Sequence, residues 1–197
     1  MRDYLLFIDT EMSGLPKRWD LPYSQEGNWP FTLQVSWLIF TKEGQPVKTE
    51  DHYIKDLSID IAESSRRIHG LTQEFINING QSREDVLSLL RNDLQTYQPI
   101  IIGHFIELDF HVLSADYQRL GQENPMQECP FFCTMLATRH RVKNPAKKYL
   151  SLDELHQQLF AVPFPNQHNA LEDAAATAAC FFELLKRREI QPGTDYR

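Results

Sequence analysis

Cysteine is scarce in this chain of 197 residues, which carries three. An odd and small number argues against a disulfide framework, so we expect reduced thiols and a cytoplasmic location. Cys129 and Cys133 are four residues apart, but no second pair of cysteines or histidines stands at zinc-finger spacing. A structural zinc site is therefore disfavoured.

Long apolar runs are also missing. No stretch approaches the roughly 20 apolar residues that a membrane-spanning helix needs. The early apolar run at residues 5–8 is too short for the core of a signal peptide. We therefore expect no membrane partner.

Positive charge is in deficit, with 20 Lys and Arg against 27 Asp and Glu and a net charge of -7. A protein that holds long duplex nucleic acid through its phosphates is usually basic. If nucleic acid is the substrate, we expect contact to be local and assisted by metal. The acidity fits a site of clustered carboxylates, and it equally fits a surface charge that keeps the protein soluble.

Five segments have the patterns of strands. Residues 4–9 and 99–103 are continuous apolar runs, typical of strands buried on both faces. Residues 32–41 and 47–55 predict a hairpin around a turn that contains Gly and Pro. Residues 130–133 predict a short fifth strand.

Helices are expected at residues 60–69, 72–78 and 106–120, and in segments that open at Ser82, Ser151 and Asn169. Capping boxes are expected for the pairs Ser82 with Asp85 and Ser151 with Glu154. The apolar stripe of the last helix is expected at Leu171, Ala174, Ala178, Phe181 and Leu185. Together these elements predict an α/β fold, with a mixed five-stranded sheet flanked by helices, as one domain over residues 1–197.

Asp9 and Glu11 are two residues apart at the end of the first strand. In an extended chain both side chains point to the same side. Two carboxylates placed together repel each other unless a cation lies between them, and Mg²⁺ prefers carboxylate oxygens. A lone pair of this kind is often only a solvated surface feature, but this pair follows four apolar residues.

Three further residues stand at the starts of helices. Asp109 lies just inside the helix that follows residues 99–103, where an acidic residue is also favoured by the helix dipole. Asn169 is the expected N-cap of the last helix, so His168 lies outside the helix and Asp173 lies one turn inside. Alone, His168 would more often be a surface or packing histidine.

The order Asp9-x-Glu11, Asp109, His168-x4-Asp173 resembles the three motifs of the DEDD exonuclease superfamily. The histidine five residues before Asp173 matches the histidine subgroup. Residues 8–15, 69–72, 103–104 and 152–155 also resemble this family, and the resemblance runs from about residue 5 to residue 185. The chain departs from the family at Phe105, where many members have Asn, and at Leu108, where many have Phe.

The resemblance implies a ribonuclease H-like fold and a metal-dependent 3′→5′ exonuclease. Such an enzyme releases nucleoside 5′-monophosphates from the 3′ end of single-stranded nucleic acid, and we favour DNA. It also implies two divalent ions, Mg²⁺ or Mn²⁺, held by Asp9, Glu11, Asp109 and Asp173, with Asp9 as the bridging ligand and Glu11 on the metal that activates water. His168 is implied as the general base.

Substrate contacts are expected from Thr10, Ser13, Gly14, Leu15, His104, Arg139, Arg141, Lys147 and Lys148. Leu15 would wedge against the terminal base. Residues 139–148 hold five of the 20 basic residues, which would steer a phosphate backbone or form only a solvated loop.

The sequence leaves alternatives open for the aromatic residues, the substrate, the partner and the activity. The aromatic residues Trp19, Tyr23 and Trp29 would stack on unpaired bases or cover the sheet edge. The enzyme would act on DNA, or on RNA as an oligoribonuclease does, and a polymerase or repair protein is a possible partner. An inactive nucleic-acid-binding module is a further alternative.

Overall fold

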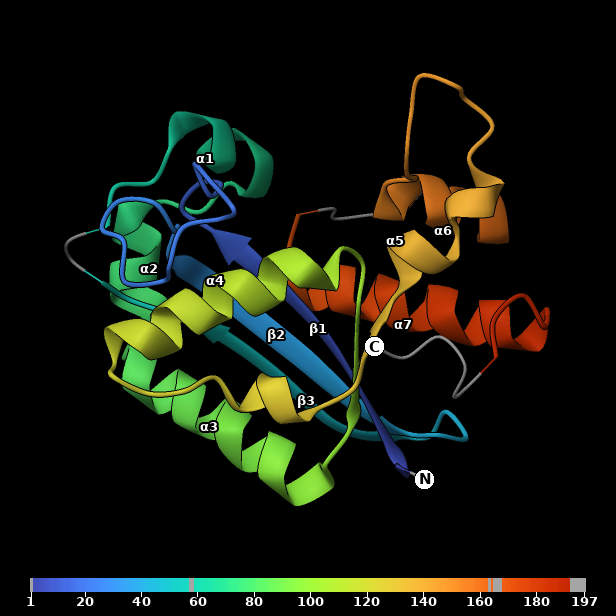
Figure 1. The fold of residues 1–197 in the computed structure, drawn as a ribbon, viewed down its shortest axis with the longest axis horizontal. Helices are drawn as coiled ribbons and strands as arrows, with labels where there is room; N and C mark the ends of the chain where they lie inside the picture. The colour runs from blue at the N-terminus through green and yellow to red at the C-terminus, as the bar shows by residue number, and fades with distance from the viewer. Residues whose placement is uncertain (1, 57–58, 163, 165–167, 192–197) are drawn as a thin grey trace.

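The computed structural model describes residues 2–56, 59–162, 164 and 168–191 (Figure 1). One sheet holds five strands in the order β3-β2-β1-β4-β5. They are β1 (Tyr4–Met12), β2 (Thr32–Thr41), β3 (Pro46–Tyr53), β4 (Ile100–Gly103) and β5 (Phe131–Cys133). The β1–β2 and β2–β3 pairs are antiparallel, and the β1–β4 and β4–β5 pairs are parallel. The expected mixed five-stranded sheet is confirmed.

The helices cover both faces of this sheet (Figure 1). They are α1 (Glu63–His69), α2 (Gln73–Asn79), α3 (Arg83–Tyr97), α4 (Ile106–Arg119), α5 (Thr134–Ala137), α6 (Leu152–Phe160) and α7 (Ala170–Lys186), with 3-10 turns at Pro125–Glu128 and Arg139–Arg141. No helix in the described ranges is long and apolar enough to cross a membrane.

Alternation along β1 divides the core into two layers. Leu6 and Ile8 pack in a cluster with α3 and α4, whereas Leu5 and Phe7 pack in a cluster with α6 and α7. Successive residues of a strand point to opposite faces, so the even and odd positions of β1 serve different layers. This alternation fixes the direction of every side chain at the carboxyl end of the strand.

Three helix starts follow their capping residues. The hydroxyl oxygens of Ser82 and Ser151 accept hydrogen bonds from the backbone N–H groups of Asp85 and Glu154. At Ser151 the Glu154 carboxylate also accepts from the Ser151 N–H, which completes a capping box. The box expected at Ser82 differs, because the Asp85 carboxylate accepts from the Ser82 hydroxyl instead. Asn169 caps α7 as expected.

Some boundaries differ from the prediction. Strand β1 continues past Asp9 to Met12, because β2 stays paired with it as far as Thr32. Helix α1 begins at Glu63, three residues later than expected. In α7, Leu184 is fully buried, while Leu171 and Leu185 are partly exposed at the edges of the buried face.

Candidate active site

Asp9 and Glu11 continue the series of β1 residues that faces α7. They stand opposite Ser36 and Gln34 in the register with β2. Glu11 is 8% exposed, and Asp9 is partly buried. The extended backbone therefore aims both carboxylates at the same layer, as the spacing predicts.

The first turn of α7 brings Asp173 to this pair. The Asn169 side-chain oxygen accepts from the N–H groups of Leu171 and Glu172, at 3.1 and 3.4 Å, and so starts the helix. The carboxylate oxygens of Asp9, Glu11 and Asp173 lie within 4.8 Å of one another.

Gln34 fixes the position of this helix start, a role that no local pattern around residue 34 indicates. Its Oε1 accepts from the Ala170 N–H at 3.3 Å, and its Nε2 donates to Asp51 Oδ1 at 2.8 Å. Gln34 is fully buried and faces Glu11 across the β1–β2 pair. The same side chain thus ties α7 to the strand beside the carboxylates.

Asp109 reaches the site from the other layer. Strand β4 pairs with β1 only as far as Phe7 and ends at Gly103. A Cβ at Gly103 would lie 2.8 Å from Ile106 Cδ1, so glycine lets the chain turn at once into α4. Thr10, which points away from Asp9 and Glu11, donates to Asp109 Oδ1 at 2.7 Å.

The crowded carboxylates resist ionisation. Burial first, and then the charges of Asp109, Asp173 and Glu11, raise the pKa of Asp9 well above its usual value. Burial and the charges of Asp173 and Asp109 raise the pKa of Glu11 to about 8. Burial raises the pKa of Asp109 to about 7, against the lowering effect of the Thr10 hydrogen bond.

Asp173 has a buried carboxylate oxygen whose surroundings show whether a metal fits the site. Burial raises its pKa to about 6, although a hydrogen bond from the His168 backbone lowers it. Its Oδ1 is buried and has no hydrogen-bond partner in the described part of the chain. A buried carboxylate oxygen without a partner is costly. A divalent cation among these oxygens would supply the partner and the missing positive charge, so the residues fit a metal.

His168 lies at the entrance to α7. It is exposed, and its backbone has a φ of 66°. The hydrogen bond from its backbone to Asp173 ties this residue to the carboxylate cluster. Its assignment as the general base stays a prediction.

His69, in the segment 69–72 that resembles the family, is a further neighbour of the site, and no role was predicted for it individually. Its Nδ1 accepts from the Leu71 N–H at 3.0 Å, and its Nε2 donates to the Met12 carbonyl at 3.3 Å. Burial lowers its pKa, and the charge of His168 lowers it further. With Nδ1 as acceptor and Nε2 as donor, the His69 ring holds the end of β1.

The residues that follow β1 differ in exposure, from the buried Ser13 to the exposed Leu15. The Ser13 hydroxyl accepts from the Phe31 N–H at 3.0 Å, and its backbone carbonyl accepts from the Ala62 N–H at 2.8 Å. Gly14 follows, and Leu15 is 72% exposed. A large apolar side chain held in the open beside the site suits the predicted wedge, which stays a prediction.

His104 has partners inside the protein on both ring nitrogens. Nδ1 lies 3.0 Å from Thr134 Oγ1, and Nε2 donates to the Leu150 carbonyl at 3.0 Å. Burial lowers its pKa to about 4, so the ring is neutral. These contacts explain His104 as a link between β4 and the segment before α6.

The basic residues at 139–148 differ in whether they form ion pairs within the protein. Arg141 makes two hydrogen bonds of 2.8 Å to Glu189, and Lys147 pairs with Glu154. Arg139 and Lys148 are exposed, and neither has an ion pair among the described residues. Lys143 is likewise exposed and without an ion pair in the described ranges, so Arg139, Lys143 and Lys148 are the cations of this segment that remain available to a phosphate.

Comparison with known proteins gives one family and one fold. The family model described as "Exonuclease" (RNase_T) matches residues 6–181, a range that includes Asp9, Glu11, Asp109, His168 and Asp173. A search of curated proteins finds no match.

Among solved structures, E. coli exonuclease I in complex with a dT13 oligonucleotide is 16% identical, with a TM-score of 0.76 over 95% of this chain and 42% of that chain. The zinc-bound form of the E. coli exonuclease I–single-stranded DNA complex is 16% identical, with a TM-score of 0.75 over 95% and 41%. A structure of SSB/exonuclease I in complex with the inhibitor CFAM is 13% identical, with a TM-score of 0.75 over 96% and 43%.

This chain thus spans less than half the length of those solved chains. They share its fold, and the family model covers most of its length. The family resemblance and the α/β fold expected from the sequence are confirmed, and the chain belongs to the exonuclease family.

Proposed function

We propose that this protein is a metal-dependent 3′→5′ exonuclease that acts on single-stranded DNA, as one catalytic domain over residues 1–197. The carrying observation is the set of carboxylate oxygens of Asp9, Glu11 and Asp173 within 4.8 Å of one another. Asp109 joins them through its effect on the pKa of Asp9. All four carboxylates lie within residues 6–181, the range that the family model matches.

Two divalent ions, Mg²⁺ or Mn²⁺, would be held by Asp9, Glu11, Asp109 and Asp173. When bound, such ions lower the pKa of a coordinated water and stabilise the charge on the leaving oxygen. The carboxylates have to be ionised to bind them, so metal displaces protons from the cluster.

His168 would take the proton from the attacking water. Its side chain is exposed at the start of α7, while its backbone holds Asp173. One residue thus joins the proposed general base to a metal ligand. The product would be a nucleoside 5′-monophosphate.

Single-stranded DNA is favoured because a solved structure of the same fold is a complex with dT13. The net charge of -7 also disfavours extensive contact with duplex phosphates. A polymerase or repair protein is the partner we would expect to present such 3′ ends.

A substrate panel tests the proposal. Oligonucleotides labelled at the 5′ end, as single-stranded DNA, duplex DNA and short RNA, are incubated with Mg²⁺ or Mn²⁺. We expect stepwise shortening from the 3′ end, fastest on single-stranded DNA. Failure to shorten any of these substrates would overturn the proposal, and faster shortening of short RNA would assign an oligoribonuclease-like activity instead.

A further inference from the structure

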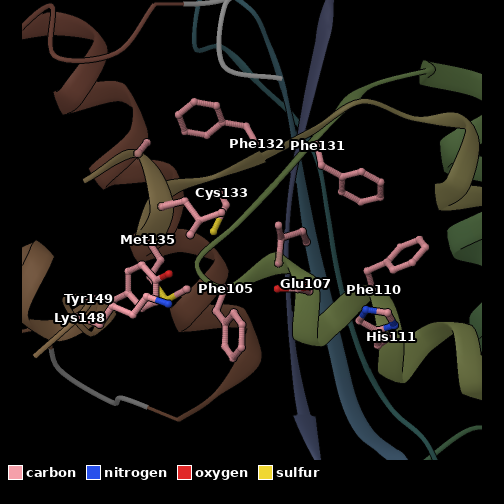
Figure 2. Close-up of a pocket in the computed structure, with 13 residues that line it drawn as sticks. Phe105, Glu107, Phe110, His111, Phe131, Phe132, Cys133, Met135, Lys148 and Tyr149 are labelled. Atoms are coloured by element: carbon pink, nitrogen blue, oxygen red, sulfur yellow. The ribbon is translucent and has the colours of Figure 1, made fainter. Parts of the chain in front are cut away.

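A cleft of about 810 Å³ lies between the start of α4 and the segment that runs from β5 into α5. Figure 2 shows Phe105 and Glu107 in its middle, with Lys148 and Tyr149 to one side and Phe110 to the other. The lining is mostly aromatic and apolar. These aromatic residues indicate a role besides stabilising the fold.

Phe105 is locally a poor choice for its position. It is the N-cap of α4, with φ 72° and ψ 39°, and its side chain makes no capping hydrogen bond. An N-cap favours a short polar side chain, and left-handed backbone disfavours a bulky one. Asn would satisfy both preferences. An outlier of this kind points to a function for the aromatic ring.

The partner of this ring is Trp19, from the segment between β1 and β2. The two ring centres are 5.9 Å apart with an interplanar angle of 38°, and Trp19 is 45% exposed. Base-sized aromatic surface is thus presented to solvent beside the cleft. Phe105 is only partly buried.

The remaining aromatics of that segment anchor it to α4. Trp29 is 3% exposed and stacks on His111 with ring centres 5.4 Å apart. The Tyr23 hydroxyl lies 2.8 Å from His111 Nδ1. Tyr23 and Trp29 therefore hold the segment in place, and Trp19 is the aromatic that stays available.

Two charged side chains of opposite sign, Lys148 and Glu107, line the same cleft. Lys148 is exposed, lies 5.1 Å from the centre of the Tyr149 ring, and has no ion pair in the described ranges. Glu107 places a carboxylate on the α4 side. A chain of phosphates would be drawn to the Lys148 side, which leaves the aromatic rings for the bases.

The cleft and the candidate active site both draw on the first turn of α4. Phe105 precedes Asp109 by four residues, about 6 Å along a helix axis. A strand whose terminal phosphodiester lay at the carboxylates would therefore carry its next nucleotides past Phe105.

We propose that Phe105 and Trp19 form a stacking platform for unpaired bases upstream of the scissile phosphodiester, with Lys148 contacting the phosphates between them. The platform rests on the proposed function and deepens it, because it accounts for a preference for single strands. Bases in a duplex are already stacked on each other and cannot offer their faces to Phe105 and Trp19.

The test compares Phe105→Asn with the wild type, and Phe75→Leu serves as a control at an exposed aromatic residue of α2 outside the cleft. Binding of 5′-fluorescein oligo(dT), and of a duplex of the same length, is measured by fluorescence anisotropy in EDTA, where no turnover occurs. We expect Phe105→Asn to weaken oligo(dT) binding by about tenfold or more, since stacking on one aromatic ring contributes that much. Duplex binding should change little.

Thermal unfolding separates this role from a structural one. Asn suits both the left-handed backbone and the N-cap, so Phe105→Asn should melt at the same temperature as the wild type or higher. Trp19→Leu should weaken oligo(dT) binding in the same way. Unchanged oligo(dT) affinity in Phe105→Asn, or an equal loss for oligo(dT) and duplex, would overturn the platform.

Failure of the proposed function would look different. Hydrolysis of the p-nitrophenyl ester of thymidine 5′-monophosphate, with Mn²⁺, needs the carboxylates but has no upstream base. We expect the wild type and the Phe75→Leu control to cleave it equally. A wild type that leaves this ester intact would contradict the exonuclease assignment, while the anisotropy result would still decide for or against the platform.

Discussion

At the scale of single residues, the site gathers buried carboxylates whose ionisation is unfavourable. Glu11 has 8% exposure and a pKa raised to about 8, because burial and the charges of Asp173 and Asp109 oppose its ionisation. Asp173 has a buried oxygen without a partner in the described chain. Such a cluster is unfavourable for folding alone, and a bound cation would make it favourable.

The first prediction concerns pH and metal removal. The folded, metal-free protein keeps protons on Glu11, Asp109 and Asp173 that the unfolded chain releases above its ordinary carboxyl pKa values. The free energy of unfolding should therefore fall as pH rises from about 4.5 to about 8. Thermal unfolding in EDTA across this range measures the effect.

Added Mg²⁺ should reverse the loss. Because metal competes with protons, Mg²⁺ should raise the melting temperature more at about pH 8 than at about pH 5. Asp9→Asn is the matched variant and should lose most of the Mg²⁺ effect. Equal stabilisation of both proteins would show that the metal binds elsewhere.

The second prediction concerns His168. With saturating Mg²⁺, log kcat of the wild type should rise with pH, because a general base acts in its unprotonated form. His168→Ala should lower kcat by about 10²- to 10⁴-fold and flatten that rise, because a general base is lost. Mg²⁺ affinity, followed by titration calorimetry, should stay close to that of the wild type. A pH profile with its slope intact in the variant would remove His168 as the base.

Sequence patterns predicted the members of this site but could not predict how they meet. The two-residue spacing of Asp9 and Glu11 fixed their common direction, because alternation is a local property of a strand. The approach of Asp109 from the opposite layer depends on where β4 stops. The role of Gln34 depends on strand pairing over long sequence separations, which no local pattern records.

At the scale of elements, the turn from β4 into α4 sets the position of Asp109. Gly103 is packed so tightly that a Cβ would lie 2.8 and 2.9 Å from two side-chain atoms of Ile106. The strand and helix are therefore joined with no room for a larger residue. A shift at this turn would displace Asp109 and the Phe105 ring together.

The third prediction follows from that packing. Gly103→Ala should destabilise the fold by about 1–3 kcal/mol, the usual cost of overpacking, which corresponds to a fall of roughly 2–12 °C in Tm for a chain of this size. Gly14→Ala is the control, because its Cβ would meet nothing closer than Ala62 at 3.9 Å. Thermal unfolding of the three proteins checks it, and equal losses in both variants would contradict the packing argument.

The elements themselves were well predicted where the signals are local. Apolar runs, the cap at Asn169 and the capping box at Ser151 depend on neighbouring residues. Strand β1 extended beyond its apolar run because pairing with β2 overrides the polarity of Asp9 and Glu11. The left-handed backbone of Phe105 was not predicted, because a bulky residue seldom takes that conformation.

At the scale of the whole molecule, the mixed sheet brings three distant parts of the chain to one end of β1. Antiparallel pairing with β2 supplies Gln34, parallel pairing with β4 delivers α4, and α7 packs across β1 and β2. The same arrangement leaves the cleft beside α4 open along the outside. Helix α4 thus contributes both to the candidate active site and to the proposed binding surface for single-stranded DNA.

The most direct test of the central claim is to identify the first product from single-stranded DNA labelled at its terminal 3′ nucleotide. With Mg²⁺, the wild type should release that label as a nucleoside 5′-monophosphate in the first turnover. EDTA should abolish the release, and Asp9→Asn should reduce it by about 1000-fold, since metal chemistry contributes several kcal/mol. Release of a longer fragment, of a 3′-monophosphate, or of the same product in EDTA would contradict the account.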